Sequence, residues 1–394
     1  MPKIIQFDPE SRKDEVTQLW WKCFNPNQTV EEVAKWAHRD LDEMEVLWGA
    51  EEAGKLVAVL AATKDCENSF RGAKLKFSGI GGVATLPEYR RDRLVRKMFK
   101  PFFHYANKQD IVISALEPFD FPFYEKFGYA MSGQNSRYEF PSTELKPIQG
   151  PAEITCKPYD PENDADDVMA VQRSMARFGS RLFIPLHRLK SKSIPHGYVF
   201  ERDGEIVGCI LVRFKEAENT WKLRMNINYT WFKSDDVLPA IVDFVYRYGS
   251  QTKEISWTME PEIPLEYFLK NPGHQTRKRE GHMMFRVLKF KEFCQQITAP
   301  MAATESVVVK LTDEHCPWND GVWKLTPSGG RLEIQPTKQE PEISFTALQL
   351  SHALGGLMTA SLLQRIAGLD CSLDAAERFT KIFPAISQFF YAHF

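Results

Sequence analysis

The chain has 394 residues, more than one hydrophobic core usually holds, so we expect two or three domains. Hydrophobic residues make up 43% of it and charged residues 26%, which excludes a disordered, collagen-like or membrane-embedded class. The formal net charge of −2 leaves no overall positive field of the kind that non-specific binding to nucleic acid requires, so we expect no nucleic-acid partner.

The seven cysteines are scattered and form no C-x-x-C pair, which is typical of a reducing cytoplasm. No histidine or cysteine spacing suggests a zinc site, so we expect no metal. The first residues lack the pattern of a signal peptide. No stretch approaches the roughly 18 consecutive apolar residues of a membrane helix. The sequence therefore predicts a cytoplasmic protein without a membrane span.

In the first region, short strand-like runs alternate with helical ones, as in an α/β or α+β domain. Strands are expected at 4–7, 46–49, 56–62, up to Thr85, 111–115 and near Tyr138, with helices at 15–23, 30–38, from about 92 and near Tyr124. Pro101 predicts a kink in its helix or an end to regular hydrogen bonding about one turn earlier. A stretch rich in proline, serine and glycine at 141–151 indicates the first domain boundary.

A second region repeats the order of the first. Its expected elements are a hairpin around Asp203-Gly204, a strand at 223–229, a helix at 237–248 and a strand at 254–259. The acidic run 160–167 is interpreted as a solvated helix start, with a metal site as the alternative. We therefore expect a tandem pair of related folds.

The third region, after residue 291, is predicted to be a small α+β module. Its expected strands lie at 306–311, 322–325 and 332–334, and its helices at 347–353, 356–365 and 372–383. The overall fold class is thus mixed α+β in three parts.

One segment carries a chemical signal, GIGGVATLPEYRR from residue 79, in which a strand and a proline-bearing turn precede a helix rich in arginine. Unpaired strand amides and amides at a helix N-terminus can hold a phosphorylated cofactor. Arg90, Arg91, Arg93 and Arg96 add positive charge that is fixed at any relevant pH. The alternative is ordinary scaffolding with surface arginines.

The next elements strengthen the first interpretation, because strand 111–115 is followed by FPFYEKFGY. Together with PEYRR and its helix, this motif resembles the GNAT acetyltransferase superfamily. The resemblance implies that acetyl-CoA is bound as co-substrate, its pantetheine arm by the strand and its pyrophosphate by the loop and first helical turn. The residues so implied are Val83, Ala84, Thr85, Arg91, Asp92, Arg93, Leu94, Val95 and Arg96.

The loop departs from the superfamily pattern R/Q-x-x-G-x-G/A at both glycines, which are Arg93 and Val95 here. Glycine lets a backbone approach phosphate closely and tolerates positive φ. We therefore expect cofactor binding to survive with altered affinity. The pair Gly81-Gly82 in the preceding strand suits a β-bulge, which would help to open a cleft beside it.

The whole chain is similar to the Eis (enhanced intracellular survival) family, on the strength of a second GNAT-like domain without the arginine loop and of a C-terminal module containing CPWNDGVWKL. This similarity implies a catalytic GNAT domain at 1–145, a degenerate GNAT-like domain at 146–288 and a sterol-carrier-protein-like domain at 289–394. It also implies a homo-oligomer, a hexamer.

The similarity further implies an N-acetyltransferase that acts on a primary amine, such as an aminoglycoside, a polyamine or a lysine, by direct attack in a ternary complex. Tyr124 would donate a proton to the sulfur, and the carboxylate of Phe394 would accept the amine's proton. Phe24 and Trp36 could wall an acceptor pocket. The alternatives are a core role for these aromatic residues, a docked final helix at the C-terminus, and a non-catalytic CoA-binding or lipid-binding protein.

Overall fold

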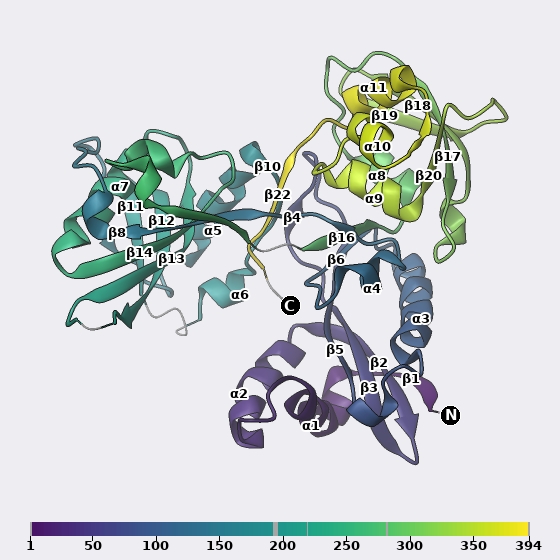
Figure 1. Ribbon diagram of the computed structural model, residues 1–394, viewed down its shortest axis with the longest axis horizontal. Coiled ribbons are helices and arrows are strands. Elements are labelled where there is room, and N and C mark those ends of the chain that lie inside the picture. Colours follow the sequence, from purple (N-terminus) through teal and green to yellow (C-terminus); the bar gives the residue numbers. More distant parts are fainter. Residues whose placement is uncertain (1, 192–195, 219, 281–282, 393–394) are drawn as a thin grey trace. The chain divides into compact units, whose positions relative to one another are not determined.

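The computed structural model describes residues 2–191, 196–218, 220–280 and 283–392 (Figure 1). These residues form two compact units: 2–132 with 283–385, and 133–280 with 386–392. The chain therefore passes into the second unit well before the boundary expected near 145, and it returns at 283. No helix among the described residues is long and apolar enough to cross a bilayer.

The first unit contains a seven-stranded sheet in the order β1-β2-β3-β5-β6-β16-β7. Its strands are β1 (Lys3–Phe7), β2 (Met44–Glu52), β3 (Lys55–Thr63), β5 (Phe77–Thr85), β6 (Ile113–Leu116), β7 (Ala130–Met131) and β16 (Met284–Val287), and the short β4 (Asn68–Ser69) lies outside this sheet. Its helices are α1 (Lys13–Phe24), α2 (Val30–Leu41), α3 (Leu94–Lys108) and α4 (Phe121–Glu125). Among the described strand pairs of this sheet, only β5–β6 is parallel.

Alternating side chains of β2 and β3 divide the hydrophobic core of this sheet into two layers. Trp48 packs with Phe99 of α3 on one face, and Leu47 packs with Trp20 of α1 on the other. The helices thus cover both faces. Of the two outcomes expected at Pro101, the early end does not occur, because α3 continues through it to Lys108, and the kink stays a prediction.

The second unit repeats this plan in a sheet ordered β15-β8-β14-β13-β12-β11-β9. Its strands are β8 (Asn135–Pro141), β9 (Thr155–Pro158), β11 (His196–Arg202), β12 (Glu205–Glu216), β13 (Leu223–Phe232), β14 (Thr252–Met259) and β15 (Thr276–Glu280), with β10 (Gly179–Leu182) and β22 (Ser387–Phe390) paired separately. Its helices are α5 (Ala165–Ser174), α6 (Leu186–Leu189) and α7 (Val237–Arg247). The expected hairpin turns at Asp203 and Gly204, whose φ angles are 50° and 79°. The run 160–167 leads into α5, with Asp166 and Asp167 in the first turn.

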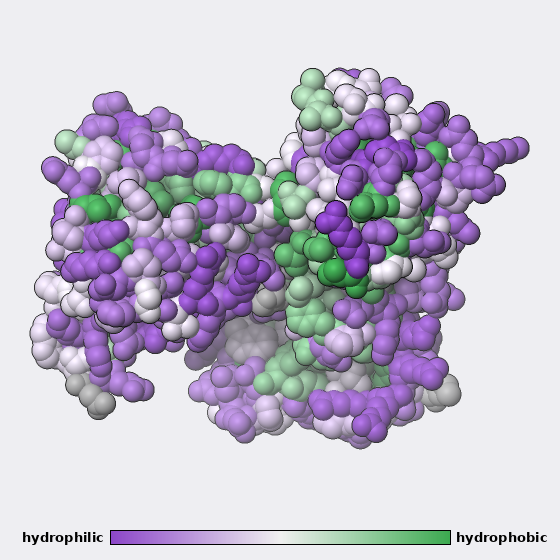
Figure 2. All heavy atoms as spheres, turned by 45° about the horizontal axis from the view of Figure 1, so that its top comes forward, coloured by the Kyte–Doolittle hydropathy of each residue, from purple (hydrophilic) through white to green (hydrophobic). Residues whose placement is uncertain are grey.

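The third module, within the first unit, is a five-stranded sheet ordered β19-β18-β17-β20-β21. Its strands are β17 (Val307–Thr312), β18 (Gly321–Ser328), β19 (Arg331–Pro336), β20 (Ile343–Thr346) and β21 (Asp370–Cys371), and its helices are α8 (Phe290–Gln296), α9 (Ala347–Gly355), α10 (Ala360–Ile366) and α11 (Leu373–Ile382). The mixed α+β class expected from the sequence is confirmed. Figure 2 shows mainly hydrophilic residues on the face toward the viewer, with hydrophobic ones in smaller groups.

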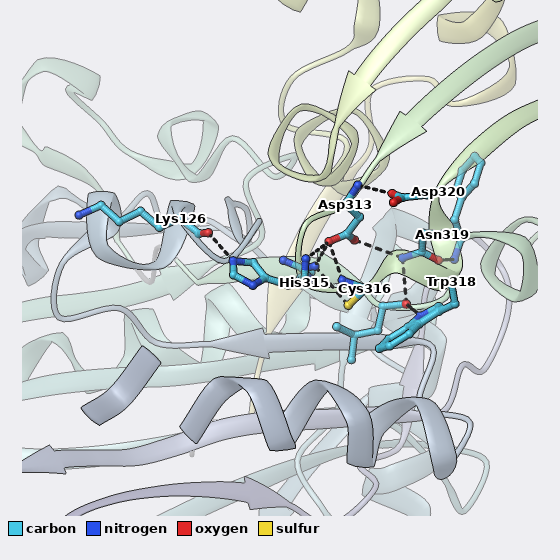
Figure 3. A network of polar contacts seen from close by, with 10 residues as sticks. Lys126, Asp313, His315, Cys316, Trp318, Asn319 and Asp320 are labelled. Atoms are coloured by element: carbon cyan, nitrogen blue, oxygen red, sulfur yellow. Dashed lines mark hydrogen bonds and ion pairs between the residues drawn. The ribbon is translucent and has the colours of Figure 1, made fainter. Parts of the chain in front are cut away.

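A buried polar network joins β16 of the first sheet to the loop after β17 (Figure 3). Arg286, which is fully buried, donates from Nη2 to Asp313 Oδ1 at 2.6 Å. The same carboxylate accepts hydrogen bonds from the backbone N–H groups of His315 and Cys316 and from the Asn319 amide. A buried charge of this kind is tolerated only while its counter-ion and hydrogen bonds are present.

We predict that Asp313→Asn lowers the free energy of unfolding by about 3–5 kcal/mol, because the Arg286 charge stays buried without a counter-ion. Urea unfolding followed by tryptophan fluorescence measures the change. The matched control is Glu314→Gln, whose ion pair with Arg96 (3.1 Å) is exposed and contributes little. Equal losses in the two variants would contradict the role of burial.

Candidate functional site

The first sheet opens beside β5. The parallel register runs from Phe77 opposite Ile113 to Ile80 opposite Leu116, where β6 ends, but β5 continues to Thr85. On its other side β5 stays paired with β3 as far as Thr85. The stretch 81–85 therefore presents one strand edge without a β6 partner, and such an edge can bind an extended ligand through its backbone groups.

A β-bulge marks the point where the two strands part. The β3–β5 register shifts there, and Gly82 adopts a φ of +58°. The Trp20 indole Nε1 donates to the Gly82 carbonyl at 2.9 Å, and a Cβ at Gly82 would lie only 2.2 Å from the indole ring. The bulge that Gly81-Gly82 predicted is confirmed, and Trp20 explains why it needs glycine.

A pocket of about 1120 Å³ lies along this edge. It is lined by Cys23, Phe24, Val83, Ala84, Thr85, Tyr89, Arg90, Arg91, Arg93, Leu94, Val95, Arg96, Phe119, Phe123, Lys126, Phe127 and Glu314. Five of these side chains carry positive charge and one carries negative charge, so the pocket favours an anionic ligand.

The arginine loop takes the backbone shape of a glycine loop. Arg91 and Arg93 have φ angles of 74° and 57°, in the left-handed region that glycine favours, and Arg93 is the N-cap of α3. The first-turn N–H groups of a helix have no intrahelical partner and attract anions. Because Leu94 and Val95 from that turn line the pocket, the helix end and the open strand edge meet in one site.

Tyr124 lies on α4 directly behind the pocket wall. Its side chain is 2% exposed, and its ring contacts Phe119 and Phe123, with ring centroids 5.3 and 5.1 Å away. Burial raises the pKa of its hydroxyl above the ordinary value, so the group stays protonated at neutral pH. Gly128, with a φ of +78°, ends the turn after α4 beside the buried Arg286.

Comparison with known proteins identifies two parts of the chain. Residues 7–132 match the family model of an acetyltransferase (GNAT) domain, and residues 290–391 match that of a sterol carrier protein domain. The N-terminal region thus carries an acetyltransferase (GNAT) domain, and the C-terminal region carries a sterol carrier protein domain. No curated protein sequence matched the chain.

Solved structures show the same fold over the whole length. A probable N-acyltransferase of Enterococcus faecalis is 19% identical, with all of both chains covered and a TM-score of 0.86. A GCN5-related N-acetyltransferase of Anabaena variabilis is 17% identical, with all of both covered and a TM-score of 0.87. Eis1 of Mycobacterium abscessus is 16% identical, with all of both covered and a TM-score of 0.81.

The GNAT domain brings most of the predicted site residues together. Of the nine expected cofactor-binding residues, all except Asp92 line the pocket, and so does Phe24. Trp36 does not line it; its ring stacks on Trp20 at a centroid distance of 5.9 Å, within the α1–α2 core. Phe394 lies outside the described residues. The alternative that the C-terminus is a docked final helix is wrong, because 387–390 form the strand β22.

Sequence reasoning missed several lining residues of the GNAT domain. Phe119, Phe123 and Phe127 recur every four residues, a helical spacing that could have placed them on one face. Glu314 carried no local signal, because its contact with Arg96 spans 218 residues of sequence. Cys23 also lines the pocket, and burial raises the pKa of its thiol. No cluster of metal-ligating residues occurs in the described ranges.

We predict that Gly82→Ala lowers the free energy of unfolding by about 2–5 kcal/mol, because it adds a clash with Trp20 to the strain of a positive φ. The control is Gly54→Ala, at a φ of +78° with open space around its Cβ. This control isolates the backbone strain, about 1–2 kcal/mol. Thermal and urea unfolding measure both variants, and equal losses would exclude the Trp20 contact as a cause.

Proposed function

We propose that the GNAT domain transfers an acetyl group from acetyl-CoA to a primary amine by direct attack within a ternary complex. The observation that carries this proposal is the pocket that joins the open edge of β5 to the arginine-lined start of α3. An aminoglycoside, a polyamine or a lysine side chain would all suit as acceptor.

The residues present fit the proposed donor. The backbone of 83–85 can bind amide groups of a pantetheine arm, and the first-turn amides of α3 can hold a diphosphate together with Arg91 and Arg93. The left-handed φ angles of both arginines support this fit, because they preserve the loop shape that glycine would otherwise supply. Acetyl-CoA would supply the acyl group as an activated thioester.

Tyr124 is proposed as hydrogen-bond donor to the departing sulfur. A thiol has an ordinary pKa of about 8.5 and tyrosine one of about 10. Since burial raises the pKa of Tyr124 further, the hydroxyl suits donation to a developing thiolate better than full proton transfer. Phe119 and Phe123 line the pocket, contact the Tyr124 ring and would help to exclude water.

Phe24 and Phe394 are proposed for the acceptor side of the reaction. Phe24 is 45% exposed in the pocket lining, where an aromatic face can attract an ammonium group. A carboxylate at Phe394 is proposed, from the family resemblance, to accept or stabilise the amine's proton. A terminal carboxyl has a pKa of about 3.5, so charge stabilisation would be its larger contribution.

A second candidate is a CoA-binding protein without turnover. It is favoured by the position of Tyr124 outside the pocket lining and by the arginine and valine that replace the loop glycines.

The cytoplasmic location and the hexamer expected from the sequence stay predictions.

We predict that Arg91→Ala weakens CoA binding about tenfold and reduces its salt dependence, because a charge-assisted contact to phosphate is lost. Isothermal titration calorimetry at two salt concentrations measures both effects. Lys97→Ala is the control, since this cation is also exposed on α3 but lies outside the pocket lining. Similar losses in the two variants would indicate a general electrostatic effect instead of a site.

The decisive experiment is a CoA-release assay with acetyl-CoA and a panel of aminoglycosides, polyamines and lysine peptides. We predict turnover by the natural chain and, for Tyr124→Phe, a kcat lowered about 100-fold with CoA affinity unchanged. Tyr105→Phe, on the side of α3 that contacts Trp48, is the control and should leave kcat unchanged. CoA binding without thiol release from any amine would favour the second candidate.

A further inference from the structure

One carboxylate lines the cationic pocket of the GNAT domain, and it comes from the sterol carrier protein domain. Among the described residues that line the pocket, Glu314 is the single acidic one, against five arginine and lysine side chains. Its Oε1 accepts a hydrogen bond at 3.1 Å from Nη2 of Arg96, which lies in the first turn of α3. The pocket proposed for acetyl-CoA is therefore completed by a residue of a different domain.

The backbone on both sides of Glu314 is anchored (Figure 3). Asp313 is buried in its ion pair with β16. The His315 ring nitrogen Nε2 lies 2.9 Å from the Lys126 carbonyl oxygen at the end of α4, and the ring stacks on Phe103 of α3 at a centroid distance of 5.6 Å. With both neighbours held, Glu314 can move only by rotation of its own side chain. Its carboxylate thus stays within a side chain's reach of the pocket when a ligand binds.

The ion pair between Arg96 and Glu314 contributes little to folding. The two side chains are 57% and 75% exposed, and exposed pairs of this kind add little to stability. Arg96 is, however, one of the cations that give the pocket its attraction for an anion. A phosphate group that binds Arg96 first has to break the pair with Glu314. The pair therefore acts on the affinity for a ligand and not on the fold.

We infer that Glu314 competes with the phosphate groups of the donor for Arg96 and so lowers the affinity of the pocket for CoA and acetyl-CoA. The inference rests on the proposed function in naming CoA as the ligand. CoA and acetyl-CoA carry the same phosphate groups, so the competition weakens both complexes alike. The sterol carrier protein domain thereby sets the affinity of a site built mainly by the GNAT domain.

The test is Glu314→Gln in the full chain, which keeps the size of the side chain and removes its charge. We expect CoA to bind about three- to fivefold more tightly at low salt, because no ion pair has to be broken. The affinity should also fall more steeply with added salt, since the pocket gains one net positive charge. Isothermal titration calorimetry at two salt concentrations measures both effects, and an unchanged affinity would overturn the inference.

A double-mutant cycle tests whether Arg96 is the group for which Glu314 competes. In an Arg96→Ala background, Glu314→Gln should tighten CoA binding by less than about 1.5-fold, because the competition has already been removed. A gain as large as in the natural background, or larger, would mean that Glu314 acts without Arg96 and would overturn the inference.

Glu88→Gln is the matched control. Glu88 is an exposed carboxylate in the turn before the arginine loop, and it lies outside the pocket lining. Removal of its charge should change the CoA affinity by less than about 1.5-fold, since solvent and salt screen exposed charges. Equal tightening in Glu88→Gln and Glu314→Gln would show an effect of net charge alone and contradict a specific role of Glu314.

The binding measurements also separate this inference from the proposed function. If the natural chain binds CoA but transfers no acetyl group, the proposed function fails, and the CoA affinities still decide the role of Glu314. If acetyl transfer occurs but the affinities are unchanged, the inference alone fails.

If the natural chain does not bind CoA, the proposed function fails and inorganic diphosphate becomes the probe. Tighter binding of diphosphate by Glu314→Gln than by the natural chain and by Glu88→Gln supports the competition. Equal binding, or no detectable binding, in all three overturns it.

Discussion

The hydrogen bond from the Trp20 indole to the Gly82 carbonyl is the contact on which the site depends. It fixes the bulge just beyond Ile80, the last β5 residue paired with β6. Without that bulge a regular sheet would satisfy the backbone groups of 81–85 internally, and no edge would remain for a ligand. The packing of α1 against β5 thus helps to keep this strand edge open.

The sterol carrier protein domain supports the same site through a loop that packs against α4. Its loop after β17 is held to β16 by the Arg286–Asp313 pair, and it places His315 against α4. The His315 ring nitrogen Nε2 lies 2.9 Å from the Lys126 carbonyl oxygen, and the ring packs on Phe127 at 5.4 Å. Because Lys126 and Phe127 line the pocket, this domain supports part of the pocket wall. That structural role does not require it to carry a lipid.

Local signals in the sequence predicted the elements well where short-range physics determines them. The helix expected at 30–38 begins at a capping box of Thr29 and Glu32, and Asp203-Gly204 makes the turn that its composition indicated. The bulge at Gly82 belongs to the same class, because glycine at that position signals an unusual backbone.

Such local signals do not predict which strands distant in the sequence pair with each other. The insertion of β16 between β6 and β7 joins segments about 150 residues apart. The four residues of β16 carry no signal that identifies β6 and β7 as its partner strands. The pairing of β22 with β10 is of the same kind, and it makes a strand of a segment for which the sequence left a docked final helix as the alternative. The lining residues on β5 and α3 could be predicted from the sequence. Glu314 could not, because only the fold brings it to the pocket.

The arginine loop illustrates how charge and backbone shape can be separated. A non-glycine residue in the left-handed region costs about 1–2 kcal/mol, and the loop accepts this cost at both Arg91 and Arg93. Glycine would relieve the strain but would remove a fixed positive charge from a pocket whose proposed ligand is a diphosphate. The second domain shows the converse, since β13 also runs past its parallel pairing with β14 but is followed by Asp235 and Asp236 before α7. The strand opening is thus the shared property of the two sheets, and the charge of the loop that follows it differs between them.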